Sequence, residues 1–230
     1  MYKTVYREGQ ISLIEKKSEF IGRVAFVKTK EGAEAYIRNI RDSGKDATHH
    51  CTAYIINEDQ SIQKYDDDGE PQKTAGPPIL DVLKRNGLTN VVCVVTRYFG
   101  GTLLGAGGLI RAYSSAASAA LDDAVVVEMH KALDITFTYD YTEHGSIENY
   151  MMQNGYPIID TVYTDRVQVT TTVYESGYEA FKGYLLDVTS GTVTIEKVDG
   201  TERAVLEGKL LYEGKSYNQK QYEGESNGKN

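Results

Sequence analysis

The chain has 230 residues and a formal net charge of −8, a length that suits one large domain or two small ones. Hydrophobic residues make up 40% of it, enough for a core, and the 25% of charged residues is an average share, so disorder is not expected. Acidic residues (33) outnumber basic ones (25), which disfavours a basic nucleic-acid coat protein.

The cysteines and the apolar stretches bear on where the protein works. Cys51 and Cys93 lie in apolar, strand-like runs, which predicts buried reduced thiols and favours a cytoplasmic protein. The first 20 residues are polar, so no signal peptide is expected. Residues 98–121 carry a single charge, Arg111, but the run is rich in Gly, Ala and Ser, and a central Arg costs roughly 2.5–3.5 kcal/mol in a membrane. No membrane span is predicted.

The first half of the chain reads as a mixture of strands and helices. The predicted elements in chain order are strands over residues 11–15 and 20–27, a helix capped by Thr29, a hairpin of residues 51–57 and 62–65, a short helix from Pro78 to Gly87, a buried strand over residues 91–96, a small-residue helix ending near Leu121, and a strand over residues 125–129.

The second half has a clearer pattern. The predicted elements are a strand over residues 133–140, a helix ended by Gly155, strands over residues 158–163 and 167–173, a helix opened by a Ser176–Glu179 capping box, a strand holding Val193 and Ile195, and an extra strand over residues 204–211 after a turn at Asp199-Gly200. Without the extra strand, this order is the ferredoxin-like β-α-β-β-α-β arrangement.

These patterns predict an α+β protein of two domains, residues 1–130 and 131–212, with residues 213–230 as a disordered tail. Residues 1–130 hold 16 basic and 17 acidic groups, a net charge of −1. Residues 131–230 hold 9 and 16, a net charge of −7. The second domain is therefore the poorer candidate for contacting phosphates.

A glycine-rich loop between the buried strand and the small-residue helix carries the strongest functional signal. Its glycines are Gly100, Gly101, Gly105, Gly107 and Gly108. Such a loop can direct backbone N–H groups at an anion, with Arg97 and Arg111 to clamp phosphate, and Tyr98 and Phe99 could stack on a ring. The loop matches neither a Walker A motif nor a dinucleotide fingerprint, which would need glycine at Ile110. The other interpretation is that the glycines permit a tight turn and close packing of the helix.

Two further segments contain residues that could carry chemistry. Asp67, Asp68 and Glu70 could hold Mg²⁺, but an ordinary turn whose Asp side chains bond backbone N–H groups is favoured. His49 precedes His50-Cys51, yet no partner residue supports a Cys–His nucleophile. No GxSxG motif or zinc-ligand spacing occurs, so no catalytic residue, metal ligand or cofactor is assigned.

Four groups of residues carry a resemblance to a known family. They are Lys17-Ser18 with Phe20; Asp46-Ala47 with His49, Cys51 and Ala53; Asp67-Asp68-Gly69-Glu70-Pro71 with Thr74-Ala75-Gly76; and Arg97-Tyr98-Phe99-Gly100-Gly101 with Gly105, Gly107-Gly108-Leu109 and Arg111-Ala112-Tyr113. Together these motifs resemble the YigZ/IMPACT family, most closely its bacterial two-domain YigZ branch, over nearly the whole chain. Lys73 and Ser114 depart from glycines common in the family, and Leu103 replaces a lysine found in some members.

The resemblance implies a first domain like the second domain of small-subunit ribosomal protein five, and a domain pair similar to the last two domains of elongation factor G. Both likenesses point to the ribosome or to structured RNA. Eukaryotic IMPACT proteins regulate translation through an additional N-terminal domain. This sequence is expected to start directly at the shared domain, so that partner is not carried over.

The resulting hypothesis is a cytoplasmic, non-enzymatic, translation-associated regulator that contacts RNA or the ribosome through its first domain. The expected contact residues are Arg97, Tyr98, Phe99, the five loop glycines and Arg111, with Lys73 as a rim charge, and the accessory residues are His49, Asp67, Asp68, Glu70 and Thr74. One alternative is a Mg²⁺-dependent enzyme or a binding protein for a nucleotide or other phosphorylated small molecule, with His49 as acid or base. Another is a protein-interaction module, in which the acidic second domain meets a protein partner.

Overall fold

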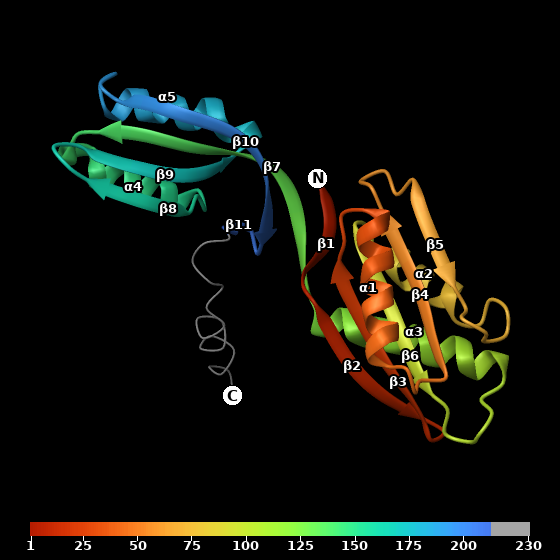
Figure 1. Ribbon diagram of the computed structural model, residues 1–230. Coiled ribbons are helices and arrows are strands. Elements are labelled where there is room, and N and C mark those ends of the chain that lie inside the picture. Colours follow the sequence, from red (N-terminus) through yellow and green to blue (C-terminus); the bar gives the residue numbers. More distant parts are fainter. Residues whose placement is uncertain (213–230) are drawn as a thin grey trace. The chain divides into compact units, whose positions relative to one another are not determined.

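The computed structural model describes residues 1–212, and the chain divides into two compact units, Met1–Glu128 and a second that begins at Met129 (Figure 1). The predicted disordered tail, residues 213–230, lies outside the described residues. Both units mix helices and strands, which confirms the expected two-domain α+β fold class.

The first unit is built around an antiparallel sheet of order β2-β3-β6-β4-β5. Its elements are β1 (Tyr2–Arg7), β2 (Gly9–Glu15), β3 (Ser18–Phe26), α1 (Lys30–Ser43), β4 (His49–Ile56), β5 (Ile62–Asp66), α2 (Gly76–Arg85), β6 (Val91–Tyr98), α3 (Ala106–Asp123) and the start of β7 (Val125–Tyr139). The sequence pattern does not predict β1, which pairs with β7. Thr29 caps α1 as expected, because its side chain accepts the N–H of Gly32 at 3.0 Å.

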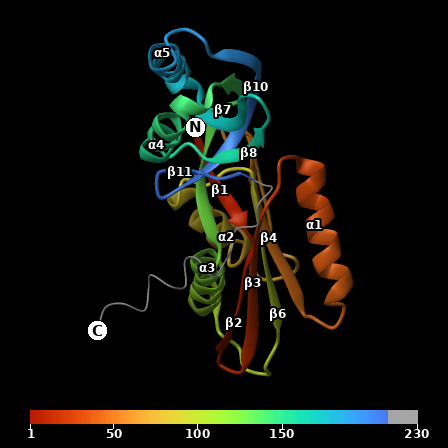
Figure 2. The ribbon, with the colours of Figure 1, turned by 90° about the vertical axis from the view of Figure 1, so that its left-hand side faces the viewer.

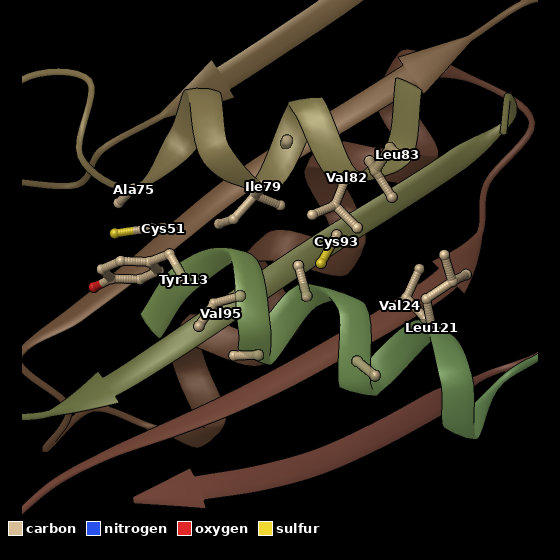
Figure 3. Packing of buried hydrophobic residues seen from close by; sticks show 14 of the residues in the cluster. Val24, Cys51, Ala75, Ile79, Val82, Leu83, Cys93, Val95, Tyr113 and Leu121 are labelled. Atoms are coloured by element: carbon tan, nitrogen blue, oxygen red, sulfur yellow. The ribbon is translucent and has the colours of Figure 1, made fainter. Parts of the chain in front are cut away.

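Helices cover both faces of this sheet (Figure 2). On one face α1 packs through Ala33 and Ile37. On the other face α2 and α3 pack over a larger cluster that includes both cysteines and Tyr113 (Figure 3). Because β4 and β6 are central strands covered on both sides, nearly every residue in them is buried, and their sequences read as continuous apolar runs rather than alternating ones.

The contact between α3 and the sheet depends on two glycines in neighbouring strands. A Cβ on Gly9 would overlap the carbonyl oxygen of Ala120, and a Cβ on Gly22 would overlap that of Ala116. The backbone of α3 therefore lies directly against the backbones of β2 and β3. This close packing of the small-residue helix was expected, but the glycines that permit it are in the strands, outside the glycine-rich loop.

The second unit is a sheet of order β11-β10-β7-β9-β8, with α4 and α5 packed against its apolar core. Its further elements are α4 (His144–Gln153), β8 (Ile158–Tyr163), β9 (Val167–Tyr174), α5 (Tyr178–Val188), β10 (Thr194–Leu206) and β11 (Lys209–Leu210), with 3-10 turns η1 (Tyr141–Glu143) and η2 (Glu175–Gly177) before the helices. The sequence β7-α4-β8-β9-α5-β10 is the predicted ferredoxin-like order.

Two local predictions in this unit are wrong. Ser176 lies within the η2 turn and α5 begins at Tyr178 with no side-chain cap, so the capping box does not form. The chain does not turn at Asp199-Gly200, because β10 continues to Leu206. The reversal comes at Glu207-Gly208, where both residues have positive φ, and leads into the two-residue strand β11. The predicted cap is replaced by a 3-10 turn, and the predicted turn is replaced by continued strand pairing.

The glycine-rich stretch over residues 98–121 is α3 with the loop before it, and α3 is buried along one side against the sheet. Among residues 1–212, no helix combines the length and the apolar character needed to cross a membrane.

We expect Gly22→Ala to lower the free energy of unfolding by about 1–3 kcal/mol, because the added methyl group must push α3 off the sheet. The matched control is Gly32→Ala in α1, where a Cβ meets only Thr29 Oγ1 at 3.4 Å. That change should raise stability by roughly 0.5–1 kcal/mol, because alanine favours helix. Urea unfolding of both variants measures the two effects, and equal effects of the same sign would contradict the close packing.

Candidate functional site

The acidic loop after β5 caps the helix that follows it. The Asp67 carboxylate accepts the backbone N–H groups of Lys73 (2.8 Å), Ala75 (3.0 Å) and Gly76 (2.8 Å). Ala75 is the N-cap residue of α2 and has no side chain to cap it, so Asp67 supplies the acceptor from eight residues earlier. This confirms the interpretation of the loop as a turn whose Asp side chains bond backbone N–H groups.

Asp68 connects the same loop to β4 and α1. Its carboxylate accepts the backbone N–H of His50 at 2.6 Å and pairs with Arg41 at 2.9 Å. Its backbone carbonyl lies 2.7 Å from Nδ1 of His49. A carbonyl can only accept, so Nδ1 of His49 carries the proton and Nε2 faces the Glu70 carboxylate, 3.9 Å away.

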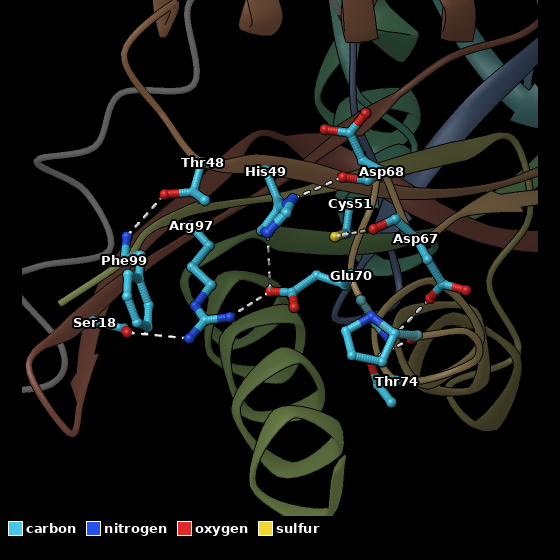
Figure 4. A network of polar contacts seen from close by, with 12 residues as sticks. Ser18, Thr48, His49, Cys51, Asp67, Asp68, Glu70, Thr74, Arg97 and Phe99 are labelled. Carbon is cyan, nitrogen blue, oxygen red and sulfur yellow. Dashed lines mark hydrogen bonds and ion pairs between the residues drawn. The ribbon is translucent and has the colours of Figure 1, made fainter. Parts of the chain in front are cut away.

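A buried ion pair lies at the centre of this site (Figure 4). Glu70 Oε1 accepts from Arg97 Nη1 at 2.6 Å, and the two side chains are only 3% and 5% exposed. The Tyr113 hydroxyl donates to the same oxygen at 2.8 Å. Arg97 also donates to Ser18 Oγ at 3.2 Å, and its guanidinium lies over the Phe20 ring at 5.3 Å. One ion pair therefore links the acidic loop, β6, α3 and β3.

The burial of Arg97 changes its expected role. It was expected to clamp phosphate, but both of its terminal nitrogens bond groups inside the fold, and Phe99 covers the guanidinium at 5.3 Å. Its β6 position places the side chain under the glycine-rich loop, with Phe99 itself 46% exposed above it. Arg97 supports the loop from below, and we do not include it among the proposed phosphate contacts.

The carboxylates proposed for Mg²⁺ do not face a common point. Asp67 serves the start of α2, Asp68 serves Arg41 and β4, and Glu70 serves Arg97 and Tyr113. Within residues 1–212, no group of three or more His, Cys, Asp or Glu residues is placed to hold a metal ion. Thr74 is buried and donates to the Pro71 carbonyl at 2.6 Å, so it too belongs to the loop's internal structure.

Both cysteines are buried reduced thiols, as the sequence predicts. The Cys51 thiol donates to the Asp67 carbonyl at 3.1 Å rather than to a histidine ring. Burial raises the pKa of the Cys51 thiol far above its ordinary value and raises the pKa of Cys93 to about 12. Thiols that stay protonated at neutral pH make poor nucleophiles, which agrees with the sequence-based view that a Cys–His pair is unsupported.

The glycine-rich loop is joined to the tip of the β2–β3 hairpin. A Cβ on Gly100 would overlap the carbonyl group of Lys17, so the two backbones touch, and the Gly100 N–H donates to Ser18 Oγ at 3.1 Å. Gly101 and Gly105 have φ values of 80° and 72°, which glycine adopts without strain. The glycines therefore serve close approach and tight turning, and the loop still presents an exposed edge.

The hairpin tip is the feature that sequence reasoning missed. Lys16 and Lys17 form its two-residue turn, between the paired residues Glu15 and Ser18, with φ values of 45° and 71°. Such turns favour Asn-Gly, because both positions need positive φ. A Lys-Lys pair between two alternating strands was the available signal. We call one exposed surface the basic tip. It combines the hairpin turn with neighbouring residues of the glycine-rich loop and α3, and consists of Lys16, Lys17, Phe99, Leu103 and Arg111.

The remaining predicted residues take other places. Tyr98 is half-buried. Lys73 is exposed, with φ of 64°, and its backbone N–H belongs to the Asp67 cap. Gly107 and Gly108 lie in the first turn of α3, and Gly108 and Arg111 line a pocket of about 360 Å³ together with Lys16.

We expect Glu70→Ala to lower the free energy of unfolding by roughly 3–5 kcal/mol, because Arg97 is left as an unpaired buried charge. Glu34→Ala, which removes surface ion pairs with Lys30 and Lys64, should cost less than about 1 kcal/mol. The double variant Glu70→Leu/Arg97→Met should recover much of the loss. Chemical denaturation measures all three, and a Glu70→Ala effect no larger than that of Glu34→Ala would rule out a central role for the pair.

The raised cysteine pKa values predict inert thiols in the folded protein. With a pKa of about 12, only about one part in ten thousand of Cys93 is thiolate at pH 8. An aromatic disulfide reagent at pH 8 should leave both cysteines unmodified until denaturant is added, and rapid labelling of the native protein would contradict the burial. The raised pKa of Cys93 also makes stability depend on pH, because the folded state holds the thiol proton more tightly than the unfolded state does. Unfolded thiols ionise near pH 9, so the stability gained from the protonated thiol is present below pH 9 and is lost as the pH rises toward 12.

Comparison with known proteins identifies both units. A family model described as the Impact N-terminal domain matches residues 16–121, and one described as a domain of unknown function, DUF1949, matches residues 137–192. The IMPACT family member YvyE of Bacillus subtilis is 39% identical over 94% of this chain and 95% of its own. The IMPACT family member YigZ of Escherichia coli is 31% identical over 80% of this chain and 91% of its own.

Two solved structures are also similar. A crystal structure of a hypothetical protein has a TM-score of 0.56 and 29% identity, covering 86% of this chain and 97% of that one. The structure of Yih1, described as a two-domain translational regulator, has a TM-score of 0.34 and 26% identity, covering 50% of this chain and 45% of that one. The sequence matches, together with the motifs of the acidic loop and the glycine-rich loop, place this chain in the YigZ/IMPACT family.

Proposed function

We propose that this protein is a translation-associated regulator that contacts structured RNA, as found on the ribosome, through the basic tip of its first unit. The observation that carries this proposal is the set of cations at the tip. Among residues 1–212, no ion pair or hydrogen bond ties the side chains of Lys16, Lys17 or Arg111 to another protein group. By contrast, the nearby polar side chains of Arg97, Glu70 and Ser18 bond to groups inside the fold.

The chemistry of the tip suits a phosphate backbone. Lysine and arginine side chains without carboxylate partners are free to replace the counterions of an RNA strand. Phe99 is 46% exposed and Leu103 is 82% exposed, so apolar surface lies beside the cations. An exposed aromatic ring next to cations is a stacking platform for an unpaired base.

The assignment to translation rests on family membership. This chain belongs to the YigZ/IMPACT family, and the resemblance implies that eukaryotic members of that family regulate translation. Three residues of the basic tip, Lys17, Phe99 and Arg111, belong to the motifs that carry the family resemblance. We therefore propose that the tip is where the family contacts the translation machinery.

The second unit is better suited to a protein partner. The sheet residues that alternate with its core are polar and are linked to one another. Thr136 bonds Thr170 at 3.1 Å, and Glu196 accepts from Thr138 and from Gln168. A sheet that reads RNA bases presents aromatic rings for stacking, whereas these positions carry threonines and a carboxylate. With a net charge of −7 for residues 131–230, we propose a protein contact here.

We propose a non-enzymatic role, because the residues that could support Mg²⁺-dependent chemistry are used inside the fold. Asp67 caps α2, and Glu70 neutralises Arg97. His49 does face Glu70, but at 3.9 Å and with Arg97 already on the same oxygen. The side chains that would have to meet a substrate are thus committed to one another.

Ribosome co-sedimentation across a salt series tests the proposal. The variant Lys16→Asn/Lys17→Gly removes two charges and gives the turn the residues that positive φ favours, so the fold is kept. If both lysines contact phosphates, binding should weaken and the slope of log K against log salt should shrink by about 1–2.

The matched control is Lys84→Ala/Arg85→Ala, which removes two exposed cations at the end of α2. That end of α2 leads into the start of β6, whereas the tip adjoins the end of β6. This control should bind ribosomes as the unmodified protein does. Equal weakening in both double variants would indicate a general charge effect, and binding that neither variant changes would refute the assignment of the tip.

A further inference from the structure

A pocket beside the basic tip is lined by apolar, positively charged and negatively charged side chains. It has a volume of about 360 Å³ and lies between the end of β2, the hairpin turn and the first turns of α3. Leu13, Phe20 and Leu104 give it apolar walls. Lys16 and Arg111 bring positive charge, and Glu15 brings a carboxylate.

We propose that this pocket binds a ribonucleoside 5′-phosphate, either free or as a single unstacked nucleotide of an RNA strand. The pocket goes beyond the proposed ribosome contact, because a free nucleotide would occupy it whether or not the protein meets a ribosome. Its volume is at the small end of the roughly 300–1,000 Å³ typical of ligand pockets, which suits one nucleotide and is too small for a dinucleotide.

The phosphate would be held by Lys16 and Arg111. Both side chains line the pocket, and within residues 1–212 neither has an ion-pair partner. Arginine binds phosphate oxygens through paired N–H groups, and lysine acts as a mobile point charge. Within residues 1–212 no carboxylate, the nearby Glu15 included, forms an ion pair with either cation, so an anionic ligand would supply the missing partner.

The rest of the nucleotide matches the remaining walls. A flat ring buries its apolar faces against Leu13 and Ile14, the large apolar lining residues that are not already buried. The Glu15 carboxylate is an acceptor for ribose hydroxyls or an exocyclic amino group, which a simple phosphate ion lacks. The pocket therefore combines cations, a carboxylate and apolar side chains. A nucleotide matches all three, with its phosphate, its hydroxyl or amino groups and its ring.

The pocket walls are also held in place. Phe20 is fully buried, contacts Tyr113 edge-to-face with centroids 5.2 Å apart, and lies under the Arg97 guanidinium. The hairpin turn is fixed by its backbone contact with Gly100. A site with fixed walls loses little entropy on binding, because its shape exists before the ligand arrives.

Titration of the full chain with each of the four ribonucleoside 5′-monophosphates, with inorganic phosphate and with a short oligoribonucleotide tests the proposal. Calorimetry gives the affinities, and amide NMR shifts at Gly108 and Ser115 report occupancy of the pocket. We expect at least one monophosphate to bind in the micromolar to millimolar range and to shift these amides. If the oligoribonucleotide alone shifts them, the nucleotide comes from RNA, which also supports the proposal.

Two variants with matched controls decide where binding occurs. Ser115→Leu fills the pocket without changing its charge and should abolish binding, whereas Ser118→Leu, also exposed on α3 but outside the pocket, should not. Arg111→Ala should weaken binding at least tenfold, whereas Arg85→Ala on α2 should leave it unchanged.

The proposal is overturned if inorganic phosphate binds as tightly as every nucleotide, since the ring and ribose would then contribute nothing. It is also overturned if Ser115→Leu behaves like Ser118→Leu, or if no probe shifts the pocket amides. Ribosome binding by the unmodified protein, with no nucleotide bound in the pocket, would leave the proposed function intact while this inference fails. Nucleotide binding without ribosome association would give the opposite result.

Discussion

The ion pair between Glu70 and Arg97 is the interaction on which the first unit depends. Both side chains are almost wholly inside the protein, where an unpaired charge would be severely destabilising. The pair is satisfied only when the acidic loop folds back over β6 and when α3 brings Tyr113 to the same carboxylate. Ser18 completes the set from β3. Four segments that are far apart in the sequence must therefore adopt their places together.

This dependence explains why polar motifs that suggest chemistry are structural here. Asp67, Asp68 and Glu70 each complete a different part of the fold: a helix cap, a link to α1 and β4, and the central ion pair. The surface beyond this network is left to the basic tip. Among residues 1–212 the cations of the tip have no ion-pair partner, and the Arg97 network holds the adjoining loop and hairpin in place. The proposed function therefore rests on side chains that the fold leaves unpaired.

Much of the fold could be predicted because its signals are local. Alternation identified β9 and most of β7, continuous apolar runs identified β4 and β6, and Thr29 marked the start of α1. The errors were also local signals, at Ser176 and Asp199, where strand pairing and a 3-10 turn prevailed. For the site, spacing along the chain could not show that Glu70 and Arg97, 27 residues apart, neutralise each other inside the fold. Lys16 was missed because a charged pair in a hairpin turn is ordinary unless its neighbours are known.

The glycines at the contact between α3 and the sheet have a consequence for how the protein can vary. Because Gly9 and Gly22 bring backbone against backbone, the position of α3 is set by main-chain atoms, which are the same in every amino acid. Side chains elsewhere in the core can be exchanged for others of similar volume without moving the helix. Arg111, near the start of that helix, keeps its place relative to Lys16 through such exchanges. The interior is thereby free to drift over evolutionary time while the spacing of charges at the surface stays constant.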